Sequence, residues 1–128
     1  KILSLISEIK ACSRRQTQSS HTAKIVESAK CIMAEKIYGD IDIPSIASQL
    51  GTSVSRFNDI FKTYTSMTPY QYYIHIKIYA AKSLLEQGDL SVKEVAYRLG
   101  FEDQYHFSRL FKKKTGIAPS QWRAFMYE

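Results

Sequence analysis

Two stretches of this sequence repeat each other about fifty residues apart, and this repetition constrains the fold more than any other feature. Residues 41–51 match residues 90–100 at a shift of 49, and residues 57–72 match residues 107–122 at a shift of 50. The second copy therefore carries one extra residue between Gly100 and Phe107. The matched pairs include Ile43 and Val92, Ile46 and Val95, Ala47 and Ala96, Leu50 and Leu99, Gly51 and Gly100, Phe57 and Phe107, Ile60 and Leu110, Phe61 and Phe111, Thr65 and Thr115, Pro69 and Pro119, and Tyr72 and Trp122. So many matches in register predict that the chain builds one structural unit twice.

Helix boundary signals divide each copy into two short helices and a third that begins at a proline. Asp42 and Ser91 precede apolar segments that end at Gly51 and Gly100, and Ser91 with Glu94 forms the pattern of a capping box. Prolines at a first helical position and glycines beyond a helix end mark the other boundaries, at Pro69, Pro119, Gly88 and Gly116. Two helices joined by a short glycine-containing turn are typical of a helix-turn-helix motif. A protein-binding helical solenoid is the alternative, although it typically needs about three units or more.

The expected fold class is all-α, with about seven helices in two helix-turn-helix subdomains joined by a long linking helix. We predict the first motif at about residues 42–64, the linking helix at about residues 69–86 and the second motif at about residues 91–115. No alternating run is long enough to indicate a strand.

Upstream of the repeat, Thr22 is expected to cap a helix that runs to about Tyr38 and stops at Gly39. Residues 1–21 are predicted to be an upstream linker or the end of a preceding domain, with a short amphipathic helix over residues 2–10. The repeat-containing domain then occupies residues 22–128.

The predicted linking helix carries apolar side chains around much of its circumference, so we expect it to be buried between the two units. These side chains are Tyr72, Tyr73, Ile76, Ile78, Tyr79, Ala80, Ala81, Leu84 and Leu85. Eighteen helical residues span roughly 27 Å at 1.5 Å per residue. Successive major-groove faces of DNA are about 34 Å apart, so a helix of this length suits two reading heads on one side of a duplex.

The net charge of +6 on 128 residues favours an acidic partner, such as a nucleic acid, an anionic membrane surface or an acidic protein. The charge is unevenly spread, at +4 over residues 1–39, zero over residues 40–88 and +2 over residues 89–128. Because the first copy of the repeat is neutral, charge alone does not select DNA. No apolar run is long enough to span a bilayer, and no membrane partner is expected.

Other residue types argue against metal, cofactor and catalytic chemistry. The two cysteines, Cys12 and Cys31, form no Cys-x-x-Cys pair and are expected to be reduced thiols. The histidines His21, His75 and His106 lie far apart and lack the spacing of metal ligands. The acidic residues are scattered, so no catalytic set is apparent. We expect no cofactor, no metal and no enzyme activity.

The second helix of each motif keeps a polar stripe after its core positions are assigned. The stripe holds Ser55, Asn58, Asp59 and Lys62 in the first copy and Tyr105, Ser108, Arg109 and Lys112 in the second, with Gln104 and His106 beside the latter. Arginine can bond guanine in a bidentate manner, asparagine and glutamine can bond adenine, and lysine suits phosphate. Each residue taken singly is equally well explained as a solvated surface side chain.

The segment GFEDQYHFSRLFKKKTGIAPSQWR, residues 100–123, closely resembles the signature of the AraC-type transcription regulators. The Gly–Phe, Phe–Ser–Arg–x–Phe–Lys and Pro–x–x–aromatic–Arg elements are all present, and residues 43–72 fit more loosely. The resemblance covers about residues 22–126. It departs at Ser66, which replaces the usual glycine, and at Ser55, where some relatives carry a large side chain.

The resemblance implies a seven-helix DNA-binding domain over residues 22–128, with recognition helices near residues 53–64 and 104–114. It implies base readers at Ser55, Asn58, Asp59, Gln104, Tyr105, Ser108 and Arg109. We expect phosphate contacts from Ser53, Arg56, Lys62, His106, Lys112 and Lys113.

The implied function is sequence-specific binding of double-stranded DNA by a bacterial, cytoplasmic transcription regulator. Contact with RNA polymerase and an upstream sensing or dimerisation domain are further properties of such regulators. A helical protein-interaction module without DNA binding is the alternative.

Overall fold

The computed structural model describes residues 17–126, and these residues form seven α-helices and no strand. The helices are α2 (Thr17–Glu35), α3 (Ile43–Gln49), α4 (Val54–Thr65), α5 (Pro69–Gln87), α6 (Val92–Arg98), α7 (Gln104–Thr115) and α8 (Pro119–Met126). The expected all-α fold is confirmed. The short helix predicted over residues 2–10, and Cys12, lie outside the described residues.

Helix α2 differs from the predicted first helix at both ends. It begins at Thr17, so residues 17–21 are helical and not linker, and the hydroxyl of Thr22 lies 2.7 Å from that of Tyr64 instead of capping a helix start. Buried residues in the second half of α2 hold this helix against the core. Once a helix is held in this way, each residue added at its start gains one backbone hydrogen bond, so α2 extends back to Thr17. At its other end, the helix stops at Glu35, and tighter i→i−3 bonds from Lys36 and Ile37 lead into the turn before Gly39.

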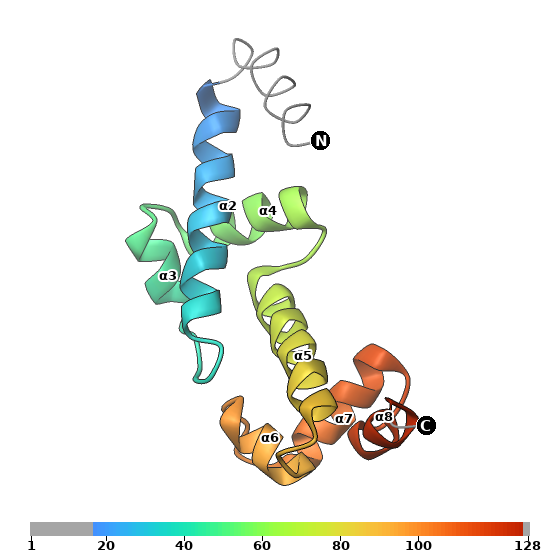
Figure 1. Ribbon diagram of the computed structural model, residues 1–128. Helices are drawn as coiled ribbons and strands as arrows, with labels where there is room; N and C mark the ends of the chain where they lie inside the picture. The colour runs from blue at the N-terminus through green and yellow to red at the C-terminus, as the bar shows by residue number, and fades with distance from the viewer. Residues whose placement is uncertain (1–16, 127–128) are drawn as a thin grey trace.

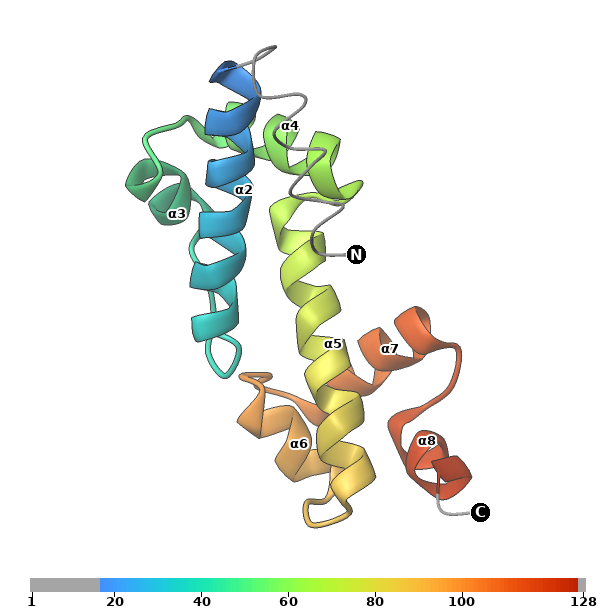
Figure 2. The same cartoon turned by 45° about the horizontal axis from the view of Figure 1, so that its top comes forward.

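Two hydrophobic cores are arranged along α5, which runs between them (Figures 1 and 2). We call α2, α3 and α4 the first unit, and α6, α7 and α8 the second unit. Tyr73 of α5 enters the first core, whereas Ile74, Ile78 and Leu85 enter the second. The expectation that the linking helix is buried between both units is therefore confirmed for these positions.

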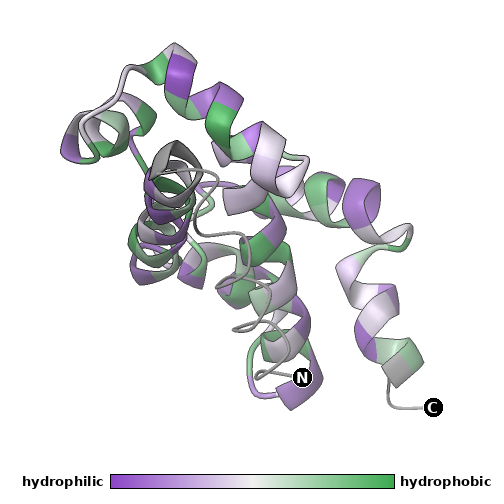
Figure 3. Cartoon of the chain, turned by 90° about the horizontal axis from the view of Figure 1, so that it is seen from above, coloured by the Kyte–Doolittle hydropathy of each residue, from purple (hydrophilic) through white to green (hydrophobic). Residues whose placement is uncertain are grey.

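One predicted core residue of α5 is wrong, because Tyr79 is 71% exposed. The circumference of α5 carries more apolar residues than the two units cover, and the outer side remains in solvent. The other helices show the same division into two faces. Bands of hydrophilic and hydrophobic residues alternate along them in Figure 3.

The repeat seen in the sequence extends to individual hydrogen bonds. The hydroxyls of Thr65 and Thr115 each donate to a carbonyl four residues back, at 2.8 Å, and each accepts from the amide two residues on. A proline then opens the next helix in both copies, as predicted. The same local sequence therefore produces the same corner twice, and α4 and α7 end in the same way.

Candidate nucleic-acid interface

Each unit contains a helix-turn-helix motif, α3–α4 in the first unit and α6–α7 in the second. Small residues, Ala47 and Ala96, are buried where the two helices of a motif meet. Gly51 and Gly100 close the turns with φ angles of 71° and 84°, a left-handed conformation that a side chain disfavours. These placements confirm the motif predicted from the sequence.

Large apolar side chains fix the second helix of each motif on its core. Phe57 and Phe61 on α4, and Phe107 and Phe111 on α7, are fully buried. The rings within each pair have centroids 5.9 Å and 5.8 Å apart. One face of α4 and one face of α7 are therefore held inward, and the opposite faces are left free.

Both of these helices begin at a capped position that orders their first turn. The Ser53 hydroxyl accepts a hydrogen bond from the Arg56 amide at 3.1 Å, and the Asp103 carboxylate accepts one from the Tyr105 amide at 2.8 Å. The Ser53 hydroxyl uses its oxygen as the cap, so its proton remains able to donate. Ser53 thus combines a structural role with the predicted phosphate contact.

The predicted base-reading positions have matched exposure in the two copies. Ser55 and Tyr105 are exposed, and so are Asp59 and Arg109, whereas Asn58 and Ser108 are both half-buried. Gln104, at the start of α7, is also half-buried. The structure therefore brings each predicted set together on one side of its helix, and no member is lost to the core.

The predicted phosphate contacts are all on the surface. Arg56 and Lys62 on α4, and Lys112 and Lys113 on α7, are exposed, and none of them forms a salt bridge within residues 17–126. Residues 103–114 carry a net charge of +3, and residues 53–64 carry +1 because Asp59 offsets one cation. Free cations on α7 are thus available to displace counterions from an acidic polymer.

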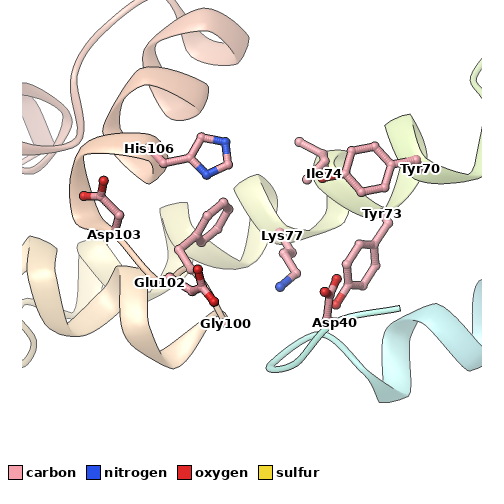
Figure 4. A pocket seen from close by; sticks show the side chains of 10 residues that line it. Asp40, Tyr70, Tyr73, Ile74, Lys77, Gly100, Glu102, Asp103 and His106 are labelled. Atoms are coloured by element: carbon pink, nitrogen blue, oxygen red, sulfur yellow. The ribbon is translucent and has the colours of Figure 1, made fainter. Parts of the chain in front are cut away.

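His106 occupies a different environment from the other predicted phosphate contacts. It lines a cavity of about 470 Å³ between α5, the start of α7 and the α2–α3 turn, and its ring meets Phe101 edge-on at 5.7 Å (Figure 4). Carboxylates of Asp40, Glu102 and Asp103 line the same cavity. Since these acids repel a phosphate, His106 has weaker support as a phosphate contact than the exposed lysines.

The floor of this cavity holds two residues with polar groups: Tyr73, predicted only as an apolar side chain of the linking helix, and Lys77, for which the sequence predicted no role. Burial raises the pKa of Tyr73 to about 12, with the charges of Asp40 and Tyr70 adding to the effect. Burial also lowers the pKa of Lys77, against the opposing influence of Asp40. A lysine inside the apolar run of α5 was the only sequence signal for this site.

The two motifs present their second helices on the same side of the molecule. In Figures 1 and 2, α3 and α6 lie toward the left and α4 and α7 toward the right, near opposite ends of α5. Helix α5 has 19 residues, which corresponds to about 28 Å at 1.5 Å per residue. The two polar stripes therefore lie near opposite ends of a helix whose length is comparable to one turn of DNA, about 34 Å.

Comparison with known proteins agrees with this geometry. Residues 46–124 match a family described as a helix-turn-helix domain. A crystal structure of an AraC-type DNA-binding-domain regulator from Chromobacterium violaceum superposes with a TM-score of 0.77 at 25% identity, over 84% of this chain and 96% of that one. The chain belongs to the AraC-type helix-turn-helix family. It is a DNA-binding domain of a transcription regulator.

Two further relatives of this AraC-type domain are informative. The DNA-binding domain of AdpA, solved in complex with a target DNA, has a TM-score of 0.72 at 28% identity, with 77% of this chain and 89% of that one covered. The MmsAB operon regulatory protein of Pseudomonas aeruginosa is 36% identical over 91 residues, or 71% of this chain. The match spans only 30% of that regulator's length.

The described part of this AraC-type domain lacks two kinds of feature. No helix among residues 17–126 is long and apolar enough to cross a membrane. In the same residues, no group of three or more histidine, cysteine, aspartate or glutamate side chains is placed to hold a metal ion.

Proposed function

We propose that this domain reads a specific double-stranded DNA sequence by placing α4 and α7 in two adjacent major grooves. The observation that carries the proposal is the pair of equivalent stripes, which have the same exposure at matched positions of both helices. The repeated fold leaves these positions accessible in both copies, and in both copies they carry polar side chains that can bond to bases. The complex of the AdpA domain with DNA supports the same use of the fold.

Base contacts are assigned to the stripes themselves. On α7, Arg109 is suited to guanine and Gln104 to adenine, while Ser108 and Tyr105 complete the surface. On α4, Asn58 is suited to adenine and Asp59 to the amino group of cytosine, with Ser55 beside them. The half-buried residues sit at the edge of each stripe, where packing limits their rotamers and favours a defined geometry.

Phosphate contacts are assigned to the exposed cations and hydroxyls around the stripes. Lys62, Arg56 and Ser53 flank α4, and Lys112 and Lys113 flank α7. Because α7 carries the larger net charge, the second unit supplies more of the electrostatic affinity. The first unit then contributes chiefly to site recognition.

The wider setting of the domain is part of the proposal. The chain spans under a third of the MmsAB regulator's length, so we propose that it acts together with an upstream sensing or dimerisation domain and contacts RNA polymerase. The setting is the cytoplasm of a bacterium, where the DNA is directly accessible. These are properties proposed for the whole regulator.

A salt titration tests the proposal. The binding of labelled genomic duplex fragments is measured by fluorescence anisotropy at several salt concentrations. The logarithm of the association constant should fall linearly with the logarithm of the salt concentration. A helical protein-interaction module would instead give no DNA binding, or binding that salt does not change. That outcome would overturn the proposed function.

A further inference from the structure

A buried lysine on the linking helix joins the two units. Lys77 is only 3% exposed, and its ammonium donates to the Gly39 carbonyl at 2.6 Å and to the Leu99 carbonyl. Gly39 belongs to the turn after α2 in the first unit, whereas Leu99 is the C-cap residue that follows α6 in the second. One side chain therefore satisfies main-chain acceptors on both units.

Beside Lys77, the backbone at Gly100 in the second unit comes close to the backbone at Gly39 in the first. A β-carbon on Gly100 would lie 2.5 Å from the Gly39 carbonyl oxygen and 3.0 Å from the Lys77 Nζ atom. The equivalent glycine of the first motif, Gly51, has no atom within 4 Å of such a β-carbon. The glycine of the second motif is thus required by the contact as well as by its φ angle.

Neighbouring side chains hold the lysine and its acceptor in place. The Tyr73 hydroxyl also donates to the Gly39 carbonyl, at 2.8 Å, so this oxygen uses both of its lone pairs. The Lys77 ammonium lies 4.8 Å from the ring centroid of Tyr73 and 5.3 Å from that of Phe101. Figure 4 shows Lys77 between Tyr73 and Gly100 on the floor of the cavity.

We propose that Lys77 is a specificity-determining residue: by locking Gly39 to the turn at Leu99 and Gly100, it fixes the orientation of α7 relative to α4, and hence the half-site spacing that the domain accepts. This inference rests on the proposed DNA-binding function. Helix α5 joins the two units by packing into both cores. The added contact supplies a second point of attachment, since the turn before α7 is held directly.

A lysine suits this position for a chemical reason. Buried carbonyl groups at the end of α6 and in the α2–α3 turn need donors, and an apolar side chain offers none. The long stem of lysine packs within the apolar face of α5, while its head reaches both acceptors. An apolar replacement of similar length removes the link and leaves the stem volume in place.

The first experiment measures, without DNA, how firmly the two units are held relative to each other. Spin labels are placed at Ser45→Cys on α3 and Ser120→Cys on α8, both exposed, after replacement of Cys12 and Cys31 by serine. The distance distribution between the labels is recorded by pulsed electron resonance. Gly51→Ala and Gly100→Ala impose the same left-handed strain, but only Gly100→Ala meets the Gly39 carbonyl. The distribution should broaden or shift in Gly100→Ala and remain as in the parent in Gly51→Ala.

A second pair of variants keeps the test valid if Gly100→Ala does not fold. Lys77→Met removes the link between the units. Lys82→Met is the control, because Lys82 is on the same helix but lies over the Trp122 ring, away from Gly39 and Gly100. Lys77→Met should broaden the distribution, and Lys82→Met should not. Equal distributions for Lys77→Met and Lys82→Met would overturn the proposal.

The second experiment measures the consequence for DNA recognition. Duplexes selected by the parent protein are rebuilt with one base pair inserted or deleted between the two half-sites, which rotates one relative to the other by about 35°. The parent should lose about tenfold or more in affinity, the size of a single defect in a DNA site, and Lys77→Met should lose less than about threefold. An unchanged spacing profile in Lys77→Met would overturn the inference. Failure of the parent to bind any duplex would count against the proposed function alone, because the spin-label result stands separately.

Discussion

Tyr73 and Arg123 stand fifty residues apart at equivalent positions of the repeat, and each lies within hydrogen-bonding distance of two main-chain carbonyls at the end of the helix that precedes its copy. The Tyr73 hydroxyl shares its one proton between the carbonyls of Lys36 and Gly39 just after α2, at 2.6 Å and 2.8 Å. The Arg123 guanidinium bonds the carbonyl of Leu85 at 3.2 Å and that of Leu90, at the end of α5. Helix α5 is therefore both the last helix of the first copy of the repeat and the helix that precedes the second copy.

Removing the Arg123 contacts should destabilise the second unit. Arg123→Met removes this donor from the Leu90 carbonyl and leaves the Leu85 carbonyl with only the Gly88 amide, at 3.3 Å, so we expect a loss of about 1–3 kcal/mol in the free energy of unfolding. Urea denaturation followed by the fluorescence of Trp122 measures it. Arg98→Met, which removes an exposed arginine from α6, is the control and should change stability by less than about 0.5 kcal/mol. Equal effects of both substitutions would contradict the assigned role.

The contribution of Tyr73 should depend on pH. The folded protein raises its pKa to about 12, so the neutral hydroxyl stabilises the fold fully below about pH 10, and this stabilisation is lost as the pH rises toward 12. The difference in unfolding free energy between the wild type and Tyr73→Phe should therefore stay constant up to about pH 9 and shrink between about pH 10 and about pH 12. Lys77, whose pKa burial lowers, is present in both proteins. A constant difference would refute this account.

Ser66 should be replaceable by glycine with a gain in stability. It ends α4 with φ of 68°, whereas the equivalent residue after α7 is Gly116, with φ of 91°. A non-glycine residue in this conformation costs about 1–2 kcal/mol, partly offset by the entropy that glycine loses on folding. We expect Ser66→Gly to stabilise by roughly 1 kcal/mol and Gly116→Ser to destabilise by a similar amount. Thermal unfolding of both variants tests this, and a destabilised Ser66→Gly protein would show that its side chain has another role.

Arg109 and Lys112 should separate specificity from general affinity. Arg109→Ala should cost roughly 1–3 kcal/mol on the selected site and little on unrelated DNA. Lys112→Ala should weaken binding to all sequences and reduce the salt slope by about 1. Because α7 carries more net charge than α4, Lys112→Ala should lower DNA affinity more than Lys62→Ala does. A larger effect of Lys62→Ala would contradict the proposed asymmetry.

Local sequence signals predicted most helix boundaries correctly. Ser91 and Glu94 form the expected capping box, with both hydrogen bonds present, and Pro69 begins α5 as expected. Gly51 and Gly100 adopt the predicted left-handed turns. These features depend on residues a few positions apart, so the sequence contains all the information that determines them.

Features that depend on distant contacts were predicted less well. The start of α2 was wrong because Thr22 looks like a cap, yet its hydroxyl lies beside Tyr64, 42 residues away. Tyr79 was placed in the core by helical periodicity, which does not show how much of a helix its neighbours cover. Lys77 gave only the anomaly of a charge within an apolar run, and its two acceptors are 38 and 22 residues away.

The central claim is that two equivalent helices read two adjacent stretches of one duplex, and selection of bound sites from random double-stranded DNA tests it most directly. The account predicts enriched sites that contain two short conserved blocks, centred about one helical turn, or 10–10.5 base pairs, apart. Arg109→Ala should erase conservation within only one of the blocks. Enrichment of a single block would contradict reading by both helices, and the absence of any enriched sequence would contradict specific DNA binding itself.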